Sequence, residues 1–167
     1  MIEIRPIQKS DLGIIIEERN KVMETLRTPF MLNLDMQIDY YNKIICNRDS
    51  KTRYFIFEEN GQSIGYGGLE NIEWENSRAE ISLLVWKSKR RKRYGTVCAE
   101  IILKYGFESL NFHSVYGECY YSGMKDFWKS FLIKCGRNFF TANLKDTKYY
   151  LGKYYDSFYF TIIKDGD

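Results

Sequence analysis

The fold is decided between Ala79 and Leu110, where the sequence reads AEISLLVW (79–86), KSKRRKRYGT (87–96) and VCAEIILKYGFESL (97–110). The first segment predicts a buried strand ending at Trp86, and apolar residues at helical spacing predict a helix from about Thr96. The turn between them is basic and contains Gly95. The first amides of a helix have no intrahelical acceptor, and the helix dipole adds partial positive charge there. The strand, the turn and the start of the helix therefore predict an anion-binding site, and we expect it to bind a phosphorylated ligand.

Positive charge is concentrated in this turn. The net charge of the chain is only +3, yet six of the seven residues from Lys87 to Arg93 are Lys or Arg. Such a concentration is typical of a local site for a polyanion. Nucleic acid is the competing ligand, but no second basic stripe occurs elsewhere in the chain. A nucleic-acid-binding protein is therefore the less favoured interpretation.

Length and composition narrow the class of protein. With 167 residues, 44% of them hydrophobic, we expect one domain spanning 1–167. The start of the chain lacks the apolar core of a signal peptide, and no apolar run approaches the roughly 20 residues of a membrane span, so we expect a cytoplasmic protein. Four scattered cysteines and a single histidine, His113, give little material for a metal site or a Ser-His-Asp triad. We therefore expect no metal.

Periodicity predicts the remaining elements. In chain order they are a strand at 2–7, a helix at 12–26 broken near 20, a helix at 35–46 capped by Asp35, strands at 54–57 and 63–72, the strand and helix described above, a strand at 113–120, a helix at 125–135, and hairpin strands at 138–142 and 149–163. Strand, crossover helix and strand in succession predict a parallel strand pair beside the basic turn. Ligands bind at the carboxyl ends of such strands.

The basic turn also resembles a known motif. Residues 90–96, RRKRYGT, resemble the Arg/Gln-x-x-Gly-x-Gly/Ala loop with which the GNAT superfamily of N-acetyltransferases holds the pyrophosphate of acetyl-CoA. Arg90 matches the first position and Gly95 the last, whereas Arg93 replaces the first glycine. Ala79-Glu80-Ile81-Ser82 is similar to the family's Ala-Glu-Ile-Gly strand, and residues 105–108, YGFE, are similar to its Tyr-Ala-Phe-Glu helix segment.

The resemblance implies an α/β (α+β) fold with a central mixed, mostly antiparallel sheet, a parallel strand pair at the acetyl-CoA site, and flanking helices. It implies acetyl-CoA as acetyl donor, and a free strand N–H near Val85 as the group that polarises the thioester carbonyl. The residues expected at the cofactor are Val85, Trp86, Lys87, Arg90, Arg91, Lys92, Arg93, Tyr94, Gly95 and Thr96.

Acetyl transfer to an amine needs a base. At neutral pH, deprotonating a lysine-like ammonium costs roughly 4 to 5 kcal/mol, whereas deprotonating an α-ammonium costs about 1 kcal/mol. Glu80 matches the family's strand glutamate and is the first candidate base, with Glu118 second; the alternative for Glu80 is an exposed or ion-paired side chain. Alignment with the family places Leu132 where many members have a tyrosine that acts as general acid, so the usual general acid is missing here. Tyr120, Tyr121 and Trp128 lie nearby, with Tyr121 as the candidate acid; a place in the core or in the cleft wall is the alternative role for each.

Two further resemblances concern the acceptor. Arg19, Asn20, Arg27 and Phe30 resemble a segment of acetyltransferases that modify nucleotide-linked amino sugars, although a surface Arg at a helix end is the alternative. The tail at 151–159, LGKYYDSFY, resembles the closing segment of members that act on protein N-termini, such as ribosomal-protein alanine acetyltransferases. The acceptor is therefore a protein N-terminal amine, an amino sugar or another small molecule. A non-catalytic acyl-CoA-binding module is the rival hypothesis, and both monomer and homodimer remain open.

Overall fold

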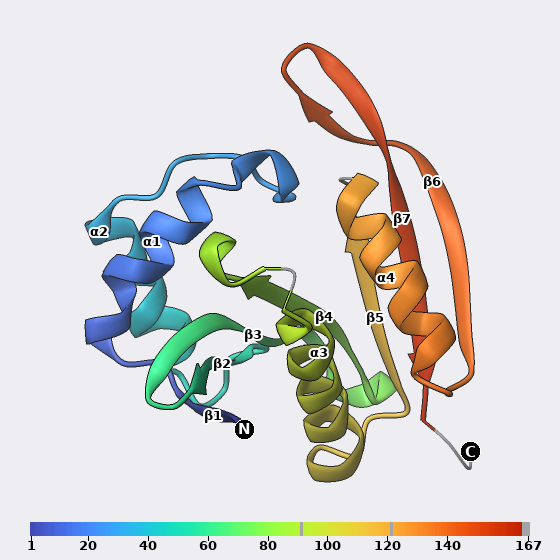
Figure 1. Cartoon of the computed structure of the whole chain (residues 1–167), viewed down its shortest axis with the longest axis horizontal. Helices are drawn as coiled ribbons and strands as arrows, with labels where there is room; N and C mark the ends of the chain where they lie inside the picture. The colour runs from blue at the N-terminus through green and yellow to red at the C-terminus, as the bar shows by residue number, and fades with distance from the viewer. Residues whose placement is uncertain (91, 121, 165–167) are drawn as a thin grey trace.

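The computed structural model describes residues 1–90, 92–120 and 122–164. Within these residues the strands form one sheet in the order β1-β2-β3-β4-β5-β7-β6 (Figure 1). The strands are β1 (Ile2–Pro6), β2 (Arg53–Glu59), β3 (Gln62–Glu73), β4 (Arg78–Val85), β5 (Ser114–Cys119), β6 (Phe139–Tyr150) and β7 (Lys153–Ile163). Neighbouring strands are antiparallel except β4 and β5, which are parallel. The expected mixed, mostly antiparallel sheet with a parallel pair is confirmed.

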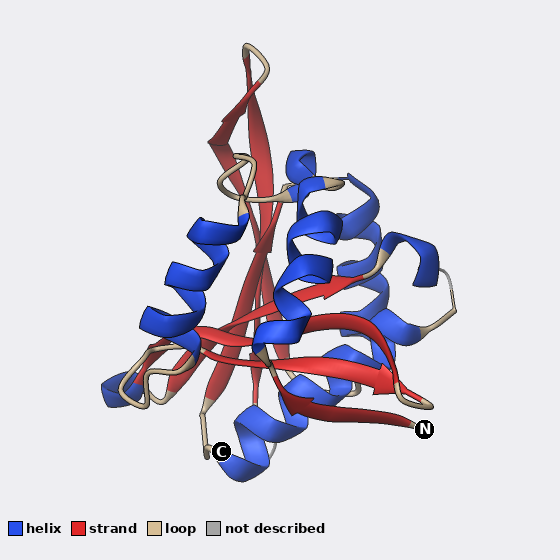
Figure 2. Ribbon diagram, turned by 90° about the vertical axis from the view of Figure 1, so that its left-hand side faces the viewer, coloured by secondary structure: helices blue, strands red, loops and turns tan. Residues whose placement is uncertain are grey.

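Helices cover both faces of this sheet (Figure 2). They are α1 (Leu12–Asn20), α2 (Leu34–Tyr40), α3 (Tyr94–Lys104) and α4 (Ser122–Lys134). Both α2 and α3 end in a π-helical turn, Tyr41–Ile45 and Tyr105–Ser109. Short 3₁₀ turns at Lys9–Asp11, Met23–Thr25, Trp74–Asn76 and Lys87–Lys89 join the other elements.

Strand alternation divides the apolar side chains between two cores. On β2, Ile56 points to the α1 side and packs with Leu12 and Ile15, whereas its neighbour Phe57 points to the α3 side. This is the two-residue period of a strand that is covered on both faces. Each fully buried side chain of this size contributes about 1.5–3 kcal/mol. The two cores therefore fix both helical layers against one sheet.

The parallel pair is short. β4 and β5 align only through the pairs Arg78–Ser114, Ala79–Val115 and Glu80–Tyr116, after which β4 continues beside β3 and β5 beside β7. Beyond Glu80 the two strands diverge. The sheet is thus open at the carboxyl ends of its parallel strands, next to the start of α3.

Three predicted boundaries were wrong. α3 begins at Tyr94, two residues before Thr96, because Arg93 is left-handed and forms the N-cap. α2 is capped by Asn33, whose side chain accepts the Met36 N–H at 2.9 Å, and not by Asp35. Helix α4 begins at residue 122, earlier than expected.

The terminal hairpin is longer than its pattern suggests. β6 continues to Tyr150, and the chain turns at Leu151 and Gly152, both with positive φ. A register shift between Leu144 and Lys148 interrupts the alternation of β6, which is why the sequence shows two short segments instead of one strand. The hairpin extends well past the helices (Figure 1). The sequence at 151–159 that resembles the protein N-terminal enzymes therefore forms this turn and the first part of β7.

None of the helices in the described residues combines the length and the apolar composition that crossing a bilayer requires.

Candidate active site

A cleft opens where β4 and β5 diverge. Its volume is about 1310 Å³, and its lining comes from the segment 25–32, from α2, from β3, β4 and β5, from the start of α3 and from α4. Pockets for single small ligands usually measure about 300–1,000 Å³. This cleft therefore has room for two ligands side by side.

The edge of β4 presents backbone groups to the cleft. The Trp86 N–H donates to the Ile64 carbonyl of β3 at 2.9 Å. Since backbone groups alternate along a strand, the amides of Val85 and Leu83 point to the opposite edge, from which β5 has diverged. Both residues line the cleft. This is the geometry that a backbone donor to a developing oxyanion requires.

The basic turn and α3 form one end of the cleft. The Val97 N–H is bonded to the Arg93 carbonyl at 3.2 Å, so the amides before Val97 form the free first turn of the helix. Arg90, Arg93, Gly95 and Thr96 all line the cleft. Arginine side chains and free helix amides are ligands for phosphate groups. The fold thus places four of the predicted cofactor residues together.

Arg93 has φ of 62°. This left-handed conformation costs a residue other than glycine roughly 1–2 kcal/mol. The conformation explains why the family motif has a glycine at this position.

Other predicted cofactor residues have different environments. Trp86 is 3% exposed, packs in the α1 core and donates its indole N–H to Ser63 at 3.2 Å. The Tyr94 hydroxyl donates to Glu59, away from the lining residues. Lys92 is exposed and does not line the cleft. Arg91 lies outside the described residues.

Lys87 contributes through its backbone. Its N–H donates to the Glu18 carboxylate at 2.8 Å, which ties the start of the basic turn to α1. Glu18 is 5% exposed and also accepts from Lys21 at 2.9 Å. Burial acts to raise the pKa of Glu18, but the bonds from Lys21 and from the Lys87 amide, with the charge of Arg90, outweigh burial and lower it. Sequence reasoning missed Glu18 because nothing local to α1 indicates a partner so far along the chain.

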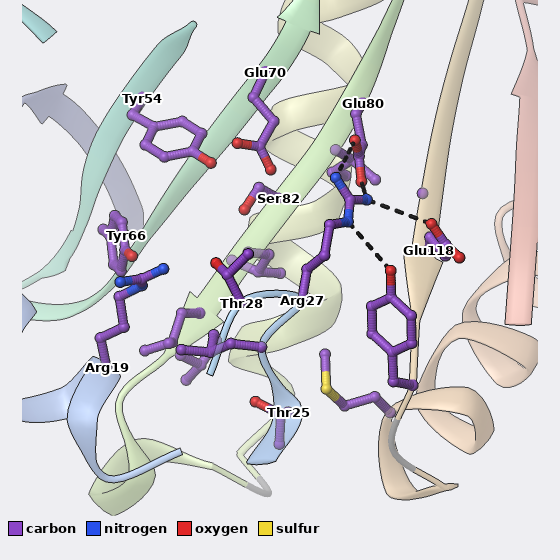
Figure 3. A pocket seen from close by; sticks show the side chains of 18 of the residues that line it. Arg19, Thr25, Arg27, Thr28, Tyr54, Tyr66, Glu70, Glu80, Ser82 and Glu118 are labelled. Atoms are coloured by element: carbon purple, nitrogen blue, oxygen red, sulfur yellow. Dashed lines mark hydrogen bonds and ion pairs between the residues drawn. The ribbon is translucent and has the colours of Figure 1, made fainter. Parts of the chain in front are cut away.

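Arg27 is at the centre of the opposite end of the cleft (Figure 3). Its guanidinium bonds to both oxygens of Glu80, to the Tyr120 hydroxyl at 3.2 Å and to Glu118 at 3.5 Å. Glu80 is 5% exposed, and its Oε2 also accepts from the Asn71 amide at 2.7 Å. Glu80 is therefore ion-paired with Arg27, and its role as a base stays a prediction.

The remaining catalytic candidates lie around this network. Glu118 accepts a hydrogen bond from Ser157 at 2.5 Å and lines the cleft. Tyr121 lies outside the described residues. Leu132 is 1% exposed in the α3 core, so α4 offers no hydroxyl at the position where the family usually has its tyrosine. Tyr120, on the other hand, faces the cleft, and burial is the main reason that its pKa is raised, which keeps its hydroxyl protonated.

The predicted acceptor residues divide into two kinds. Arg19 and Phe30 line the cleft, with the guanidinium of Arg19 lying 5.5 Å from the centre of the Phe30 ring. Asn20 does not line it. Its side chain exchanges two 2.9 Å hydrogen bonds with the backbone of Leu32 and so closes the loop that carries Arg27. Asn20 therefore holds the segment that carries Arg27 from outside the cleft.

Sequence reasoning missed Glu70. This β3 residue lies directly opposite Glu80 on β4, lines the cleft, and lies near Tyr54 and Ser82 (Figure 3). Burial raises its pKa, and the neighbouring charge of Glu80 acts in the same direction. The available signal was a glutamate in a strand otherwise rich in glycine and apolar residues. The register needed to place it beside Glu80 was not predictable.

Across the described residues no three His, Cys, Asp or Glu side chains come together as a metal ion would need.

Comparison with known proteins agrees with this geometry. The family described as Acetyltransferase (GNAT) domain matches residues 2–122. Spermidine N(1)-acetyltransferase of Escherichia coli (strain K12) is 26% identical over 118 residues, which are 69% of this chain and 62% of that protein. The chain thus matches less than two thirds of that relative's length.

Solved structures share the fold. Spermidine N-acetyltransferase from Vibrio cholerae, in complex with CoA and spermine, superposes with a TM-score of 0.84 at 22% identity, covering 97% of this chain and 95% of that one. A dodecameric structure of spermidine N-acetyltransferase from the same organism gives a TM-score of 0.81, also at 22% identity, covering 97% and 93%. With a family match over more than half of its length and the cleft between its splayed parallel strands, this chain belongs to the GNAT family of acetyltransferase domains.

Proposed function

We propose that this protein transfers an acetyl group from acetyl-CoA to a primary amine of a small molecule, by direct attack of the amine while both substrates are bound. The observation that carries the proposal is the cleft itself, with backbone and arginine donors at one end and carboxylates at the other. A donor carrying phosphates fits the first end, and a cationic amine fits the second.

The residues present fit acetyl-CoA. Its pyrophosphate is matched by the free amides at the start of α3 and by Arg90 and Arg93, which line the same end of the cleft. When bound, acetyl-CoA supplies the thioester carbonyl carbon that the amine attacks. The amides of Val85 and Leu83 at the open edge of β4 are the donors available to the carbonyl oxygen as negative charge develops on it.

Direct attack is favoured over a cysteine-linked intermediate. Burial raises the pKa of Cys98 to about 12 and that of Cys119 to about 11, so neither forms the thiolate that a nucleophile needs at neutral pH. Cys46 and Cys135 do not line the cleft. Tyr120, protonated and at the end of β5, is the hydroxyl that we assign to the departing sulfur.

A polyamine is the proposed acceptor class. The acceptor end carries the carboxylates of Asp39, Glu70, Glu80 and Glu118, partly balanced by Arg19, Arg27 and Lys43. An extended cation can contact several of these carboxylates at once. The relatives described above are spermidine acetyltransferases, which supports this choice over an amino sugar or a protein N-terminus.

The rival acyl-CoA-binding module is motivated by the absence of the usual tyrosine on α4. Thermal unfolding with acetyl-CoA, followed by release of free CoA thiol with spermidine, an amino sugar and an alanine-starting peptide, separates the hypotheses. At 100 times its Kd the donor adds about 2.7 kcal/mol, or several degrees in Tm. We expect a shift and turnover with spermidine. A shift without turnover of any amine would support the binding module, and no shift would reject both.

A further inference from the structure

An irregularity in β3 brings three polar side chains together. Glu70 pairs with Glu80 and Glu73 pairs with Arg78, so that two residues of β3 oppose one residue of β4. This is a β-bulge, and Asn71 within it is left-handed at φ 49°. Bulges re-aim side chains and are over-represented beside active sites. Here the bulge lets the amide of Asn71 reach Glu80 while Glu70 still faces the cleft.

The two opposed carboxylates have unequal surroundings. Both oxygens of Glu80 accept from Arg27, and one also accepts from Asn71. Both carboxylate oxygens of Glu80 are thus occupied by donors in a site that is 5% exposed. Glu80 is therefore committed to holding Arg27 in place.

Glu70 forms no ion pair within the described residues, although the charge of Arg27 acts on it from nearby. The polar groups beside it include the neutral hydroxyls of Tyr54 on β2 and Ser82 on β4. A carboxylate has about four acceptor sites, so two neutral hydroxyls leave it able to accept from a substrate in the cleft.

The groups that face Glu70 from the surrounding elements are Tyr54 from β2, Glu80 and Ser82 from β4, Arg27 from the loop after α1, Tyr40 from α2, and Tyr66 from β3, with Arg19 of α1 beyond the tyrosines. Burial is the largest cause of a raised pKa in each of the three tyrosines, to about 12 for Tyr40, so all of them stay neutral. Burial likewise raises the pKa of Glu70 itself. A carboxylate pair with such different environments is the usual mark of divided acid–base roles.

Building on the acetyltransferase function proposed above, we propose that Glu70 is the catalytic group that accepts the proton of the acceptor amine, directly or through one water, while Glu80 is a positioning residue that anchors Arg27. This assigns the base to β3 in place of the β4 glutamate that the sequence motif suggested. The bulge at Asn71 is the local structure that makes the division possible.

The acceptor arrives as an ammonium and gives one proton to the Glu70 carboxylate, which frees the nitrogen lone pair. The nitrogen forms a bond to the thioester carbonyl carbon, and the carbon–sulfur bond breaks. Tyr120 gives its proton to the departing sulfur and takes up the second proton from the nitrogen, so the products are the amide, CoA thiol and the proton that Glu70 returns to solvent.

The test compares Glu70→Gln with Glu80→Gln, using Glu73→Gln as control because Glu73 lies on the same strand outside the cleft. The readouts are kcat and KM for spermidine as a function of pH, with acetyl-CoA binding measured separately by thermal shift. We expect E70Q to keep the acetyl-CoA shift, to lose roughly 10²-fold or more in kcat, and to lose the acidic limb of the pH profile. E80Q should keep that limb and raise KM, and E73Q should match the parent.

Two further measurements separate chemistry from folding. Glu70→Asp retains a carboxylate and should restore part of the rate together with the acidic limb. An α-amine acceptor, with a pKa of about 8 against about 10.4 for a lysine-like amine, needs less help and should show a smaller E70Q deficit.

An acidic limb that persists unchanged in E70Q, or that disappears in E80Q instead, would overturn the assignment while leaving the acetyltransferase function standing. A parent protein that acetylates no amine would overturn the function, and the assignment with it.

Discussion

The proposed donor end and the proposed acceptor end of the cleft are built in different ways. The donor end comes from one contiguous stretch, 85–96, and relies on backbone amides together with Arg90 and Arg93. The acceptor end joins side chains from distant parts of the chain, since Arg27 and Glu118 are 91 residues apart in sequence. A backbone site tolerates sequence change provided that the turn is kept, whereas a side-chain network changes with each residue. Acceptor choice can therefore diverge while the donor site is preserved.

The largest effect is expected at the donor end from Gly95→Val. A Cβ at Gly95 would lie 3.2 Å from the ring of Phe127 on α4, and both residues line the cleft. Valine must push Phe127 into the cleft or move α4 away. Overpacking of this kind costs about 1–3 kcal/mol. If the displaced Phe127 ring occupies the cleft, acetyl-CoA must push it back on binding, which raises the Kd measured by calorimetry by roughly 5- to 150-fold.

The matched control is Gly13→Val, because nothing lies within 4 Å of a Cβ at that glycine in α1. It should leave the Kd for acetyl-CoA unchanged. Equal affinities of the Gly95 variant and the parent would show that the donor end does not depend on the close contact between α3 and α4.

At the acceptor end, Arg27→Met should impair amine binding and leave acetyl-CoA binding nearly unchanged. The variant leaves the buried Glu80 without its cation, which should lower the free energy of unfolding by about 2 kcal/mol and raise KM for the amine. The Kd for acetyl-CoA should stay within about twofold, because Arg27 does not contact the basic turn. Denaturant unfolding and steady-state kinetics measure the two effects.

Arg27→Lys serves as the control for charge. A lysine keeps the positive charge but lacks the fork that reaches Glu80, Tyr120 and Glu118 together, so an intermediate KM is expected. A large loss of acetyl-CoA affinity in either variant would show that the two ends of the cleft are coupled instead of independent.

The same contrast explains what the sequence could reveal. The strand, basic turn and helix at the donor end are contiguous and periodic, so their order and the parallel pair were predictable, and the anion site stays a prediction. The acceptor network was not, because the opposition of Glu70 and Glu80 depends on strand register, and Asn71 reaches Glu80 only through a bulge. The start of α3 was mispredicted for a related reason, because it depends on a backbone conformation that the sequence does not reveal. Arg93 starts α3 early through a conformation that its residue type does not suggest.

Stability as a function of pH should differ in sign between two glutamates. Glu18, which holds Lys87, has a lowered pKa, so its contribution to stability is present above the unfolded pKa of about 4.3 and is lost as pH falls through the folded value. Glu18→Gln should therefore lower the free energy of unfolding by about 1 kcal/mol at neutral pH. The difference from the parent should vanish in acid.

Glu70 should show the opposite trend. Its pKa is raised, so stability is greatest below the unfolded pKa and is lost as pH rises through the folded value. Glu70→Gln should remove this loss. Urea unfolding of the parent and both variants across the acid range gives the slope of unfolding free energy against pH that each glutamate contributes. Slopes of equal sign would contradict a lowered pKa for Glu18 together with a raised pKa for Glu70.

The smallest effect is expected from Arg93→Gly, which separates backbone strain from charge. Glycine adopts the left-handed conformation without penalty but loses more entropy on folding, so the net gain in stability should be under about 1 kcal/mol. Acetyl-CoA affinity should fall at the same time because one cation leaves the donor end. Arg93→Ala loses the cation and retains the strain, so it should weaken binding equally without raising Tm. A glycine variant that is stabilised and also binds acetyl-CoA as tightly as the parent would mean that the charge of Arg93 contributes nothing there, and that the free amides of α3 together with Arg90 account for the binding of the donor.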